Sequence, residues 1–423
     1  MFRVLGTCVL GLLLGSTAVT AQEERFLVTR LAPDLLMLGT DQGQYSNNSL
    51  VFTGPDGVLL VDTHDAEDAA ALRAYVEGLG LGTPKYIINT HRHIEHIGGN
   101  AAFGPAPVIV AHRLLPEKLR RGTFLFCEFP PEAFPDVTFV DSLVIRFNGE
   151  TIRLVAIGGS HDDNEILVHF TRHGVAHVSS VVNGFNFPSV DRDGNALGFA
   201  AQTRRLMKLL PRDVRLVSGH NGRASGFDFV GRWEQLPAYA DMMDETVDRV
   251  RQALAAGRSA GEMKAAGLLD GFARYAGSYV DAAGWIDTLV EALTQSRDTR
   301  QDICGPVYET WKTSGARAAV RHYRSLIENQ AAEFNGGEQT LLAIGSKLFT
   351  REMYGDADEF LTGCLEIYPG AEYAYYAHYL AARCCQELER TDEAVRHCRE
   401  SLRLQDGFAP AATLLSEIEA AAK

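Results

Sequence analysis

Short apolar runs that end in polar or glycine-containing segments recur along the first half of the chain. Residues 86–88 (Tyr-Ile-Ile) form one such run, and Asn89-Thr90 mark its end. The segments Gly57–Asp62, Ile152–Ile157 and Val214–Ser218 repeat the arrangement. Runs of this length, bounded by turn-forming residues, are typical of buried strands. The pattern therefore predicts several strands, each followed by a polar loop.

After Gly222 the apolar positions follow a helical period instead. The segment Leu236–Ala256 is predicted to be one helix, Gly257 its end and Ser259 the N-cap of the next. A second apolar stripe starts at Trp285. A stripe that contains Trp can line a substrate cleft, but we interpret this one as core packing. We expect Arg232–Gln301 to form a helical extension packed on the preceding domain. The apolar positions are Met242, Met243, Val247, Val250, Leu254, Trp285, Ile286, Leu289, Val290 and Leu293.

Residues 302–423 contain a repeat signal whose spacing resembles tetratricopeptide units, which are helix–turn–helix pairs. Ala357 and Ala394 hold equivalent positions 37 residues apart, against a period of about 34, so the connection would contain an insertion. An unrelated helical bundle is the alternative. Stacked repeats form extended surfaces, so a protein partner is possible. The unit positions are Gly345, Ala357, Leu361 and Pro369, then Ala382, Ala394, Cys398 and Leu402, with an earlier degenerate unit at Tyr308, Trp311, Gly315, Ala319 and Tyr323.

The amino terminus has the order of a secretory signal. Arg3 supplies a positive charge, Val4–Leu14 is apolar, and small residues precede Gln22. The apolar run is shorter than the roughly 20 residues that cross a bilayer. We expect residues 1–21 to be removed and the protein to be periplasmic or secreted, without a membrane span after cleavage. An uncleaved anchor is the alternative.

Composition limits the classes of partner. The 423 residues include 46% hydrophobic positions, enough for large cores, and a formal net charge of −14. This acidity argues against a nucleic-acid partner. Of the seven Cys, four fall in predicted carboxy-terminal helices, where buried thiols are the simplest interpretation and one disulfide is the alternative. These four are Cys364, Cys384, Cys385 and Cys398.

The strongest chemical signal follows the strand at residues 86–88. His91, His93, Glu95 and His96 lie within six positions. Imidazole and carboxylate groups are ligands of zinc and related metals. His91 and His93 are two apart in an extended loop and so point to the same side, while Glu95 and His96 enter the next helix. The spacing predicts a metal-binding face.

This stretch resembles the HxHxDH motif of the metallo-β-lactamase superfamily, with Glu95 in place of the motif Asp. Further segments resemble the family in its order: His161 follows Gly158-Gly159-Ser160, and His220 follows Gly219. The resemblance covers roughly residues 25–230. It implies an αββα sandwich, which we expect over residues 22–231. With the helical extension at 232–301 and the repeat-like helices at 302–423, the expected fold class is α+β.

The resemblance also implies two zinc ions. His91, His93 and His161 would hold the first, and Glu95, His96 and His220 the second. Asp62 would orient a ligand His from behind. Where relatives place Asp or Cys, this chain has Ser179 and Ser180, as in the third subclass of true metallo-β-lactamases. Glu95 has one methylene more than the motif Asp, so its carboxylate would be displaced unless the loop adjusts.

Several neighbouring polar residues leave alternatives open. His64 follows Asp62-Thr63 and is interpreted as a loop residue that binds no metal. Asp163 and Glu165 either accept hydrogen bonds behind the ligands or are solvated loop charges. Four other His match no motif position and are interpreted as ordinary strand or surface residues: His112, His169, His173 and His177.

The resulting expectation is a zinc-dependent hydrolase acting on a small molecule. A metal-bound hydroxide would attack an amide, ester, lactone or β-lactam carbonyl, and Glu95 would also orient the nucleophile or pass a proton. The alternative is a catalytically weak or inactive relative whose repeats serve in binding or assembly. The complete set of five His favours the enzyme, since a protein that only binds partners has no need of them.

Overall fold

The structure is a computed structural model. It describes residues 25–40, 47–120, 129–191, 193–220, 230–277, 280–294 and 300–421, and the expected signal segment lies outside these ranges. The chain divides into two compact units: residues 1–117 with 129–297, and residues 118–128 with 298–423.

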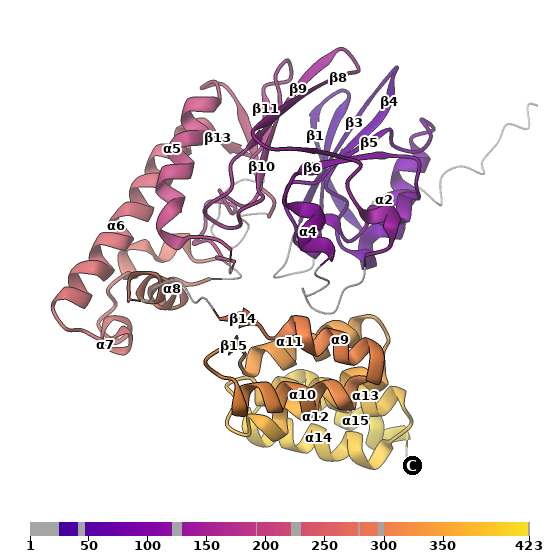
Figure 1. The fold of residues 1–423 in the computed structure, drawn as a ribbon, viewed down its shortest axis with the longest axis vertical. Coiled ribbons are helices and arrows are strands. Elements are labelled where there is room, and N and C mark those ends of the chain that lie inside the picture. Colours follow the sequence, from indigo (N-terminus) through magenta and orange to yellow (C-terminus); the bar gives the residue numbers. More distant parts are fainter. Residues whose placement is uncertain are drawn as a thin grey trace, which may run out of the picture. The chain divides into compact units, whose positions relative to one another are not determined.

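The first unit contains two sheets (Figure 1). The larger sheet has seven strands in chain order, β1 to β7. Strands β1 to β4 pair antiparallel, and β4 to β7 pair parallel. The apolar runs predicted at residues 57–62 and 86–88 are the adjacent strands β4 and β5. The strands are β1 (Phe26–Ala32), β2 (Leu35–Thr40), β3 (Asn48–Gly54), β4 (Gly57–Val61), β5 (Tyr86–Ile88), β6 (Val108–His112) and β7 (Val137–Phe139).

The second sheet has six strands in the order β13-β12-β11-β10-β9-β8. All pairs are antiparallel except β11 with β12. The other two predicted strands are confirmed here as β9 and β12. The strands are β8 (Ser142–Phe147), β9 (Glu150–Ala156), β10 (Ile166–Phe170), β11 (Val175–His177), β12 (Arg215–Val217) and β13 (Gly231–Arg232).

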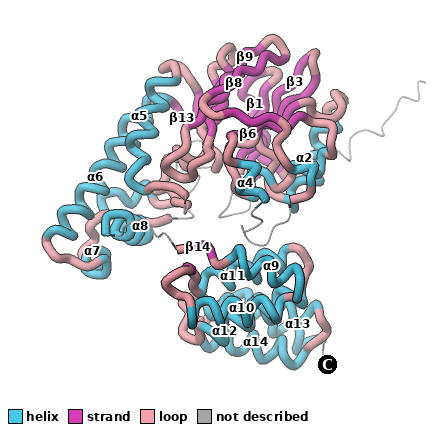
Figure 2. Tube along the Cα trace, viewed as in Figure 1, coloured by secondary structure: helices cyan, strands magenta, loops and turns pink. Residues whose placement is uncertain are grey.

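The two sheets pack face to face, and helices cover both outer faces (Figure 2). Side chains from both sheets share one core; Phe52 and Phe170, for example, meet edge to face with ring centroids 5.4 Å apart. Helix α2 (Ala66–Gly78) packs Leu72 and Val76 on the outer face of the first sheet. Helices α5 (Phe199–Leu209), α6 (Leu236–Ala255) and α8 (Ala282–Thr294) share a core with the second sheet. The predicted αββα sandwich is confirmed.

The helical predictions after Gly222 are also confirmed. Gly257 follows α6 with a φ of 80°, a conformation that favours glycine. Ser259 caps α7 (Ala260–Ala265) through a reciprocal capping box with Glu262. Trp285 is fully buried, stacks on Phe187 and donates its indole N–H to Thr246 at 3.0 Å. The Trp stripe is therefore core, and the cleft alternative is wrong for Trp285.

Shorter helices connect these elements. α3 (Ile94–Ile97) follows β5 and α4 (Leu115–Arg120) follows β6. The 3-10 helices are η1 (Asn100–Phe103), η2 (Pro131–Ala133), η3 (Ala196–Gly198), η5 (Trp233–Gln235) and η6 (Asp270–Tyr275).

Among its described residues, the regular structure of the second unit is helical apart from the short parallel pair β14 (Gln301–Asp302) and β15 (Phe334–Asn335). Consecutive helices contact in pairs: α9 with α10, α11 with α12, and α13 with α14. Small residues allow close packing, since a Cβ built on Gly345 would lie 2.6 Å from Leu361 Cγ. Helices are confirmed here, while their assignment as tetratricopeptide units stays a prediction. The helices are α9 (Cys304–Ser314), α10 (Ala316–Asn329), α11 (Glu338–Thr350), α12 (Tyr354–Ile367), α13 (Ala374–Glu387), α14 (Thr391–Leu404) and α15 (Ala409–Ala421).

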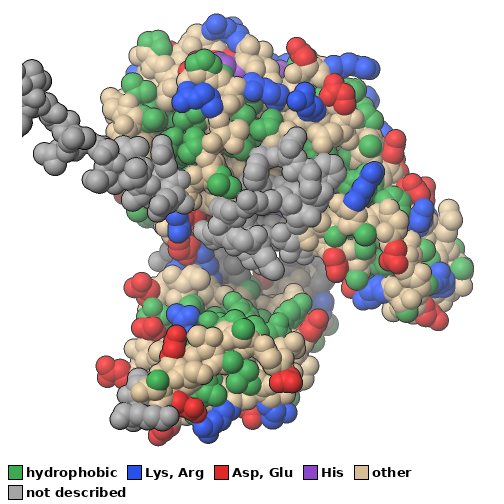
Figure 3. Space-filling view, turned by 180° about the vertical axis from the view of Figure 1, so that it is seen from behind, with side chains coloured by type: hydrophobic (Ala, Val, Ile, Leu, Met, Phe, Trp, Pro, Cys, Tyr) green, Lys and Arg blue, Asp and Glu red, His purple; other side chains and the backbone are tan. Residues whose placement is uncertain are grey.

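Three further observations concern the surface, the helices and the thiols. Figure 3 shows Lys and Arg side chains interspersed with Asp and Glu over the visible face. Within the described ranges, no helix combines the length and apolarity needed to cross a membrane. The four predicted helical thiols are buried and free: Cys364, Cys384, Cys385 and Cys398.

Candidate metal centre

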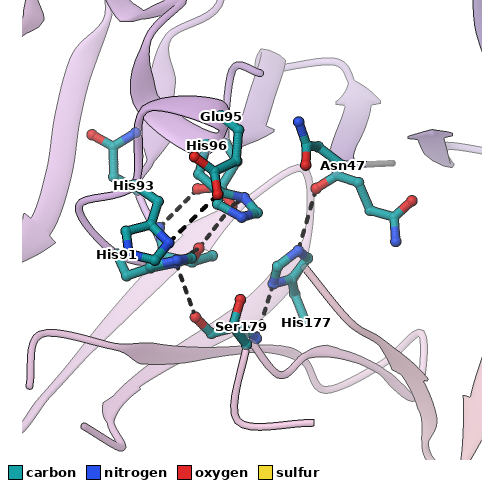
Figure 4. A network of polar contacts seen from close by, with 12 residues as sticks. Asn47, His91, His93, Glu95, His96, His177 and Ser179 are labelled. Carbon is teal, nitrogen blue, oxygen red and sulfur yellow. Dashed lines mark hydrogen bonds and ion pairs between the residues drawn. The ribbon is translucent and has the colours of Figure 1, made fainter. Parts of the chain in front are cut away.

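The loop after β5 gathers four of the predicted ligands. His91 and His93 lie in this loop, and Glu95 and His96 lie in α3, as predicted. Figure 4 shows these four side chains turned toward one another. The rings of His91 and His96 lie 4.4 Å apart between centroids, and those of His91 and His93 lie 4.6 Å apart. The other two predicted ligands come from loops that follow strands of the second sheet: His161 follows β9 and His220 follows β12.

His91, His93 and His161 form a first group whose ligand atoms lie within 4.8 Å of one another. All three side chains are buried. His93 Nδ1 lies 3.2 Å from His161 Nε2, and His91 Nε2 is buried without a hydrogen-bond partner. One nitrogen of each ring therefore faces a common point.

In His93 and His161, the ring nitrogen that points away from the cluster (the outer nitrogen) already has a hydrogen-bond partner. His161 Nδ1 lies 2.9 Å from the Ser189 carbonyl oxygen, which can only accept, so Nδ1 carries the proton. His93 Nε2 lies 2.7 Å from Asp191 Oδ2. In the neutral rings, His93 Nδ1 and His161 Nε2 thus present lone pairs to each other. Such an arrangement needs a cation between the nitrogens, either a proton or a metal ion.

Glu95, His96 and His220 form a second group on the same spacing. His96 Nε2 lies 3.3 Å from His220 Nε2. Glu95 Oε1 lies 3.5 Å from His93 Nδ1 and 3.9 Å from His220 Nε2, so this carboxylate sits between the two groups. Its side chain is 27% exposed, compared with 9% for His93 and 8% for His220. Glu95 thus marks the more open side of the cluster.

Asp62 lies behind the second group, in the position expected of an orienting carboxylate. Its Oδ2 accepts from His96 Nδ1 at 3.0 Å, and the Thr90 backbone N–H donates to its Oδ1 at 2.8 Å. Asp62 adopts a φ of 60° to reach this position. Gly99 permits the loop after β4 to approach α3, since a Cβ there would lie 2.2 Å from the Thr63 carbonyl oxygen. Glycine at position 99 is therefore a packing requirement.

Burial and mutual repulsion disfavour positive charge on most of the rings. Burial, with the charge of nearby His96, holds the pKa of His91 well below its usual value and lowers the pKa of His220 to about 3. Burial and His93 lower the pKa of His161 to about 4. These rings are neutral at pH 7, the form that binds metals.

Two side chains depart from this pattern. Burial opposes charge on His93, but the carboxylates of Asp191 and Glu95 outweigh it and raise the pKa of His93 well above its usual value. Burial likewise opposes ionisation of Glu95, and the neighbouring His93 holds its pKa well below the usual range. Glu95 is therefore a carboxylate, and His93 is the ring that carries a proton until a metal replaces it.

The serines after β11 lie beneath the first group. Ser179 Oγ lies 3.3 Å from His91 Nδ1, and the Ser180 backbone N–H donates to Glu165 at 3.0 Å. Glu165 is fully buried, which removes the solvated-charge interpretation for it. Burial and the charge of Asp162 raise the pKa of Glu165 to about 8. Asp163 is partly exposed.

The remaining His lie outside both groups. His64 is buried against Phe26 with ring centroids 5.2 Å apart, in agreement with its interpretation as a loop residue. His177 is a buried strand residue beneath the site, where it accepts from the Ser179 backbone N–H at 3.3 Å (Figure 4). His173 bridges Glu150 and Asp34 at a distance of 2.9 Å from Asp34.

Sequence reasoning missed Asp191, Arg92 and Thr90, which contact the predicted ligands or their supports. Thr90 Oγ1 donates to Asp62 and lies 3.1 Å from His91 Nδ1. Thr90 and Arg92 adjoin the motif His in sequence, and this proximity was the local signal for them. Asp191 lies 98 residues from His93, and no local pattern links them.

Comparison with known proteins identifies the family of the domain that contains this site. Residues 43–220 match the family described as "Metallo-beta-lactamase superfamily". No curated protein matches the sequence.

Two solved structures are similar to the chain. A metallo-beta-lactamase from Pontibacter korlensis is 17% identical, with a TM-score of 0.44 over 52% of this chain and 99% of its own. A double mutant of the sec-alkyl sulfatase PisA1 is 14% identical, with a TM-score of 0.50 over 92% of this chain and 68% of its own. At this identity the second likeness shows a common fold. The sandwich domain of this chain belongs to the metallo-β-lactamase superfamily.

Proposed function

We propose that the protein is a zinc-dependent hydrolase with two metal positions. The observation that supports this most directly is the set of imidazole nitrogens that face one another across 3.2 and 3.3 Å. The outer nitrogens of His93, His96 and His161 are already hydrogen-bonded. Neutral imidazole with one carboxylate is a typical zinc ligand set. His91, His93 and His161 would hold the first ion, and Glu95, His96 and His220 the second.

The chain's own residues would prepare this chemistry. Bound zinc supplies a water that ionises near pH 7 and a positive charge against a developing oxyanion. Glu95, ionised and located between the two groups, would accept a hydrogen bond from the attacking water and fix its direction. Asp62 would hold His96 with its Nε2 toward the ion. The buried rings exclude bulk water from the ligand side.

The proposed substrate is a small molecule with an amide, ester, lactone or β-lactam carbonyl. One fold supports several such reactions, so the fold does not identify the bond that is hydrolysed. The proposal of a carbonyl substrate rests on the set of metal ligands. A secondary-alkyl sulfate belongs in the same test, because one structural neighbour, which is similar over 92% of this chain, is a sec-alkyl sulfatase. We further propose that the protein acts in the periplasm or outside the cell, on the basis of the signal-like residues 1–21.

The alternative is a weakly active or inactive relative that serves as a binding module. Its support is Glu95 in place of Asp, the Ser179-Ser180 segment and the helical tail. Against it stands the burial of five imidazoles whose nitrogens face one another, an arrangement that a protein serving only as a binding module does not need.

A hydrolysis panel on metal-free and zinc-loaded protein separates the two. The panel holds a lactone, a β-lactam, a simple ester, a simple amide and a secondary-alkyl sulfate. We expect turnover of at least one compound, its loss on chelation, its return with zinc, and its absence from His93→Ala. Zinc-loaded protein that cleaves none of the five would favour the binding module.

A further inference from the structure

One loop of the first unit contacts two of the three rings in the first group. The described residues of the segment 189–195 lie against the loop that contains His161. The Asp191 backbone N–H donates to the His161 carbonyl at 2.9 Å, and the Asn195 N–H donates to the Ser160 carbonyl at 2.6 Å. A Cβ on Gly194 would lie 2.3 Å from the His161 carbonyl oxygen, so only glycine permits this approach. The backbone thus fixes Asp191 relative to His161.

From this position the loop reaches both rings. The Ser189 carbonyl accepts from His161 Nδ1 at 2.9 Å, and Asp191 Oδ2 lies 2.7 Å from His93 Nε2. Each contact involves the nitrogen that points away from the cluster. A proton held on that nitrogen leaves the lone pair on the other one, His161 Nε2 or His93 Nδ1.

Arg92 holds the Asp191 carboxylate in place. It lies between His91 and His93 in sequence, so in extended backbone its side chain points opposite to theirs. Its guanidinium pairs with Asp191 Oδ2 and, at 2.6 Å, with Asp162 Oδ2. The Asp162 side chain is fully buried, and Arg92 and Asp191 are 16% and 18% exposed.

The same arrangement excludes a simpler interpretation of these carboxylates. His93, Asp162 and Asp191 are close enough to one another to hold an ion. The Arg92 guanidinium, however, already supplies a positive charge to both carboxylates. Asp191 is therefore placed to act on His93 rather than to bind a third metal.

We propose that Asp191 is a positioning residue of the first metal site, fixing the tautomer and ring orientation of His93 so that Nδ1 points to the ion, and that Arg92 anchors it. This inference rests on the proposed metal centre. Carboxylates behind a ligand His raise its basicity and hold its ring, and their removal lowers metal affinity by about 10–100-fold.

The test measures zinc affinity of the full chain by chelator competition, in wild type and three variants. Asp191→Ala removes the contact, while Asp191→Asn keeps an oxygen that accepts from His93 Nε2. The matched control is Asp34→Ala, which removes a carboxylate 2.9 Å from Nε2 of His173, a ring outside both groups. Circular dichroism checks folding, and Asp191→Asn provides the test if Asp191→Ala does not fold.

We expect Asp191→Ala to lower the affinity for one of two zinc ions by about 10–100-fold, Asp191→Asn to lower it less, and Asp34→Ala to leave it unchanged. Cobalt-loaded Asp191→Ala should also show an altered visible spectrum, which a purely structural role would not produce. Wild-type affinity and spectrum in Asp191→Ala, or an equal loss in Asp34→Ala, would overturn the inference alone. Wild type that binds no zinc would overturn the metal centre and this inference together.

Discussion

Glu95 is the residue on which the second metal position depends most. It replaces the motif Asp, yet its carboxylate lies between His93 and His220 rather than in solvent. The surrounding loop therefore fits the longer side chain. Glu95→Asp would withdraw the oxygen by about 1 Å or more, beyond the roughly 0.5 Å that such sites tolerate.

We predict that Glu95→Asp lowers the affinity for the second zinc ion by more than about tenfold. Removing a group that only orients a ligand already lowers metal affinity by about 10–100-fold, and Glu95 is proposed to be a ligand itself. Glu95→Gln should be worse, because it removes the negative charge and the proton acceptor. Zinc titration of both variants and the turnover of any substrate found provide the measurement. Unchanged zinc content and turnover in both would remove Glu95 from the mechanism.

Glu165 links the site to the pH dependence of stability. Its pKa is raised from 4.5 to about 8 in the folded protein, first by burial and then by Asp162. Between these values the folded state holds a proton that the unfolded state has released, so stability falls as the pH rises through this window.

We predict that Glu165→Gln, a neutral mimic of the protonated acid, stabilises metal-free protein at pH 9 by roughly 3–5 kcal/mol, since a pKa difference of one is worth about 1.4 kcal/mol. At pH 5 the variant and wild type should differ by less than about 1 kcal/mol. Chemical unfolding at both pH values checks this. A difference of the same size at both would contradict the assigned protonation of Glu165.

The sequence predicted single residues well only where the chemistry is local. His91, His93, Glu95 and His96 stand within six positions, and the family resemblance then indicated where to find His161 and His220. Asp191 could not be found in this way, because its link to His93 exists only after the two loops pack together.

Helices and strands were predicted where one face of the element carries the apolar residues. The helix α6 agrees with its predicted bounds within one residue, and Ser259 caps α7 as expected. The order of strands in the two sheets did not follow from the pattern, because β12 pairs parallel with β11 across the intervening helix α5. Apolar spacing reports which face is buried but not the neighbouring strand.

Glycines test how closely the helices of the second unit pack. A Cβ on Gly363 of α12 would lie 2.5 Å from Cγ1 of Val320 on α10, whereas a Cβ on Gly355 of the same helix meets no atom within 4 Å. We predict that Gly363→Ala destabilises this unit by about 1–3 kcal/mol through overpacking. Gly355→Ala should be neutral or stabilise it by up to about 1 kcal/mol. Thermal unfolding of the two variants gives the comparison. Equal unfolding midpoints would show that α12 is not tightly packed against α10 at Gly363.

The two units have separate hydrophobic cores among the described residues. Three core clusters draw only on residues 26–293, and the two others only on residues 303–418. All six proposed ligands lie in the first unit. We predict that a chain ending at Gln301 stays folded and binds zinc as the full chain does. Circular dichroism and metal content test this, and an insoluble or metal-free product would make the carboxy-terminal helices part of the catalytic unit.

Zinc content per chain, measured by mass spectrometry on folded wild type and on His93→Ala, tests the metal centre most directly. We predict close to two zinc ions in wild type. His93→Ala should lose the ion of the first site and all hydrolysis while its circular dichroism stays that of wild type, because the sandwich has its own apolar core. Wild type without zinc, or His93→Ala with its full zinc content and activity, would contradict the account.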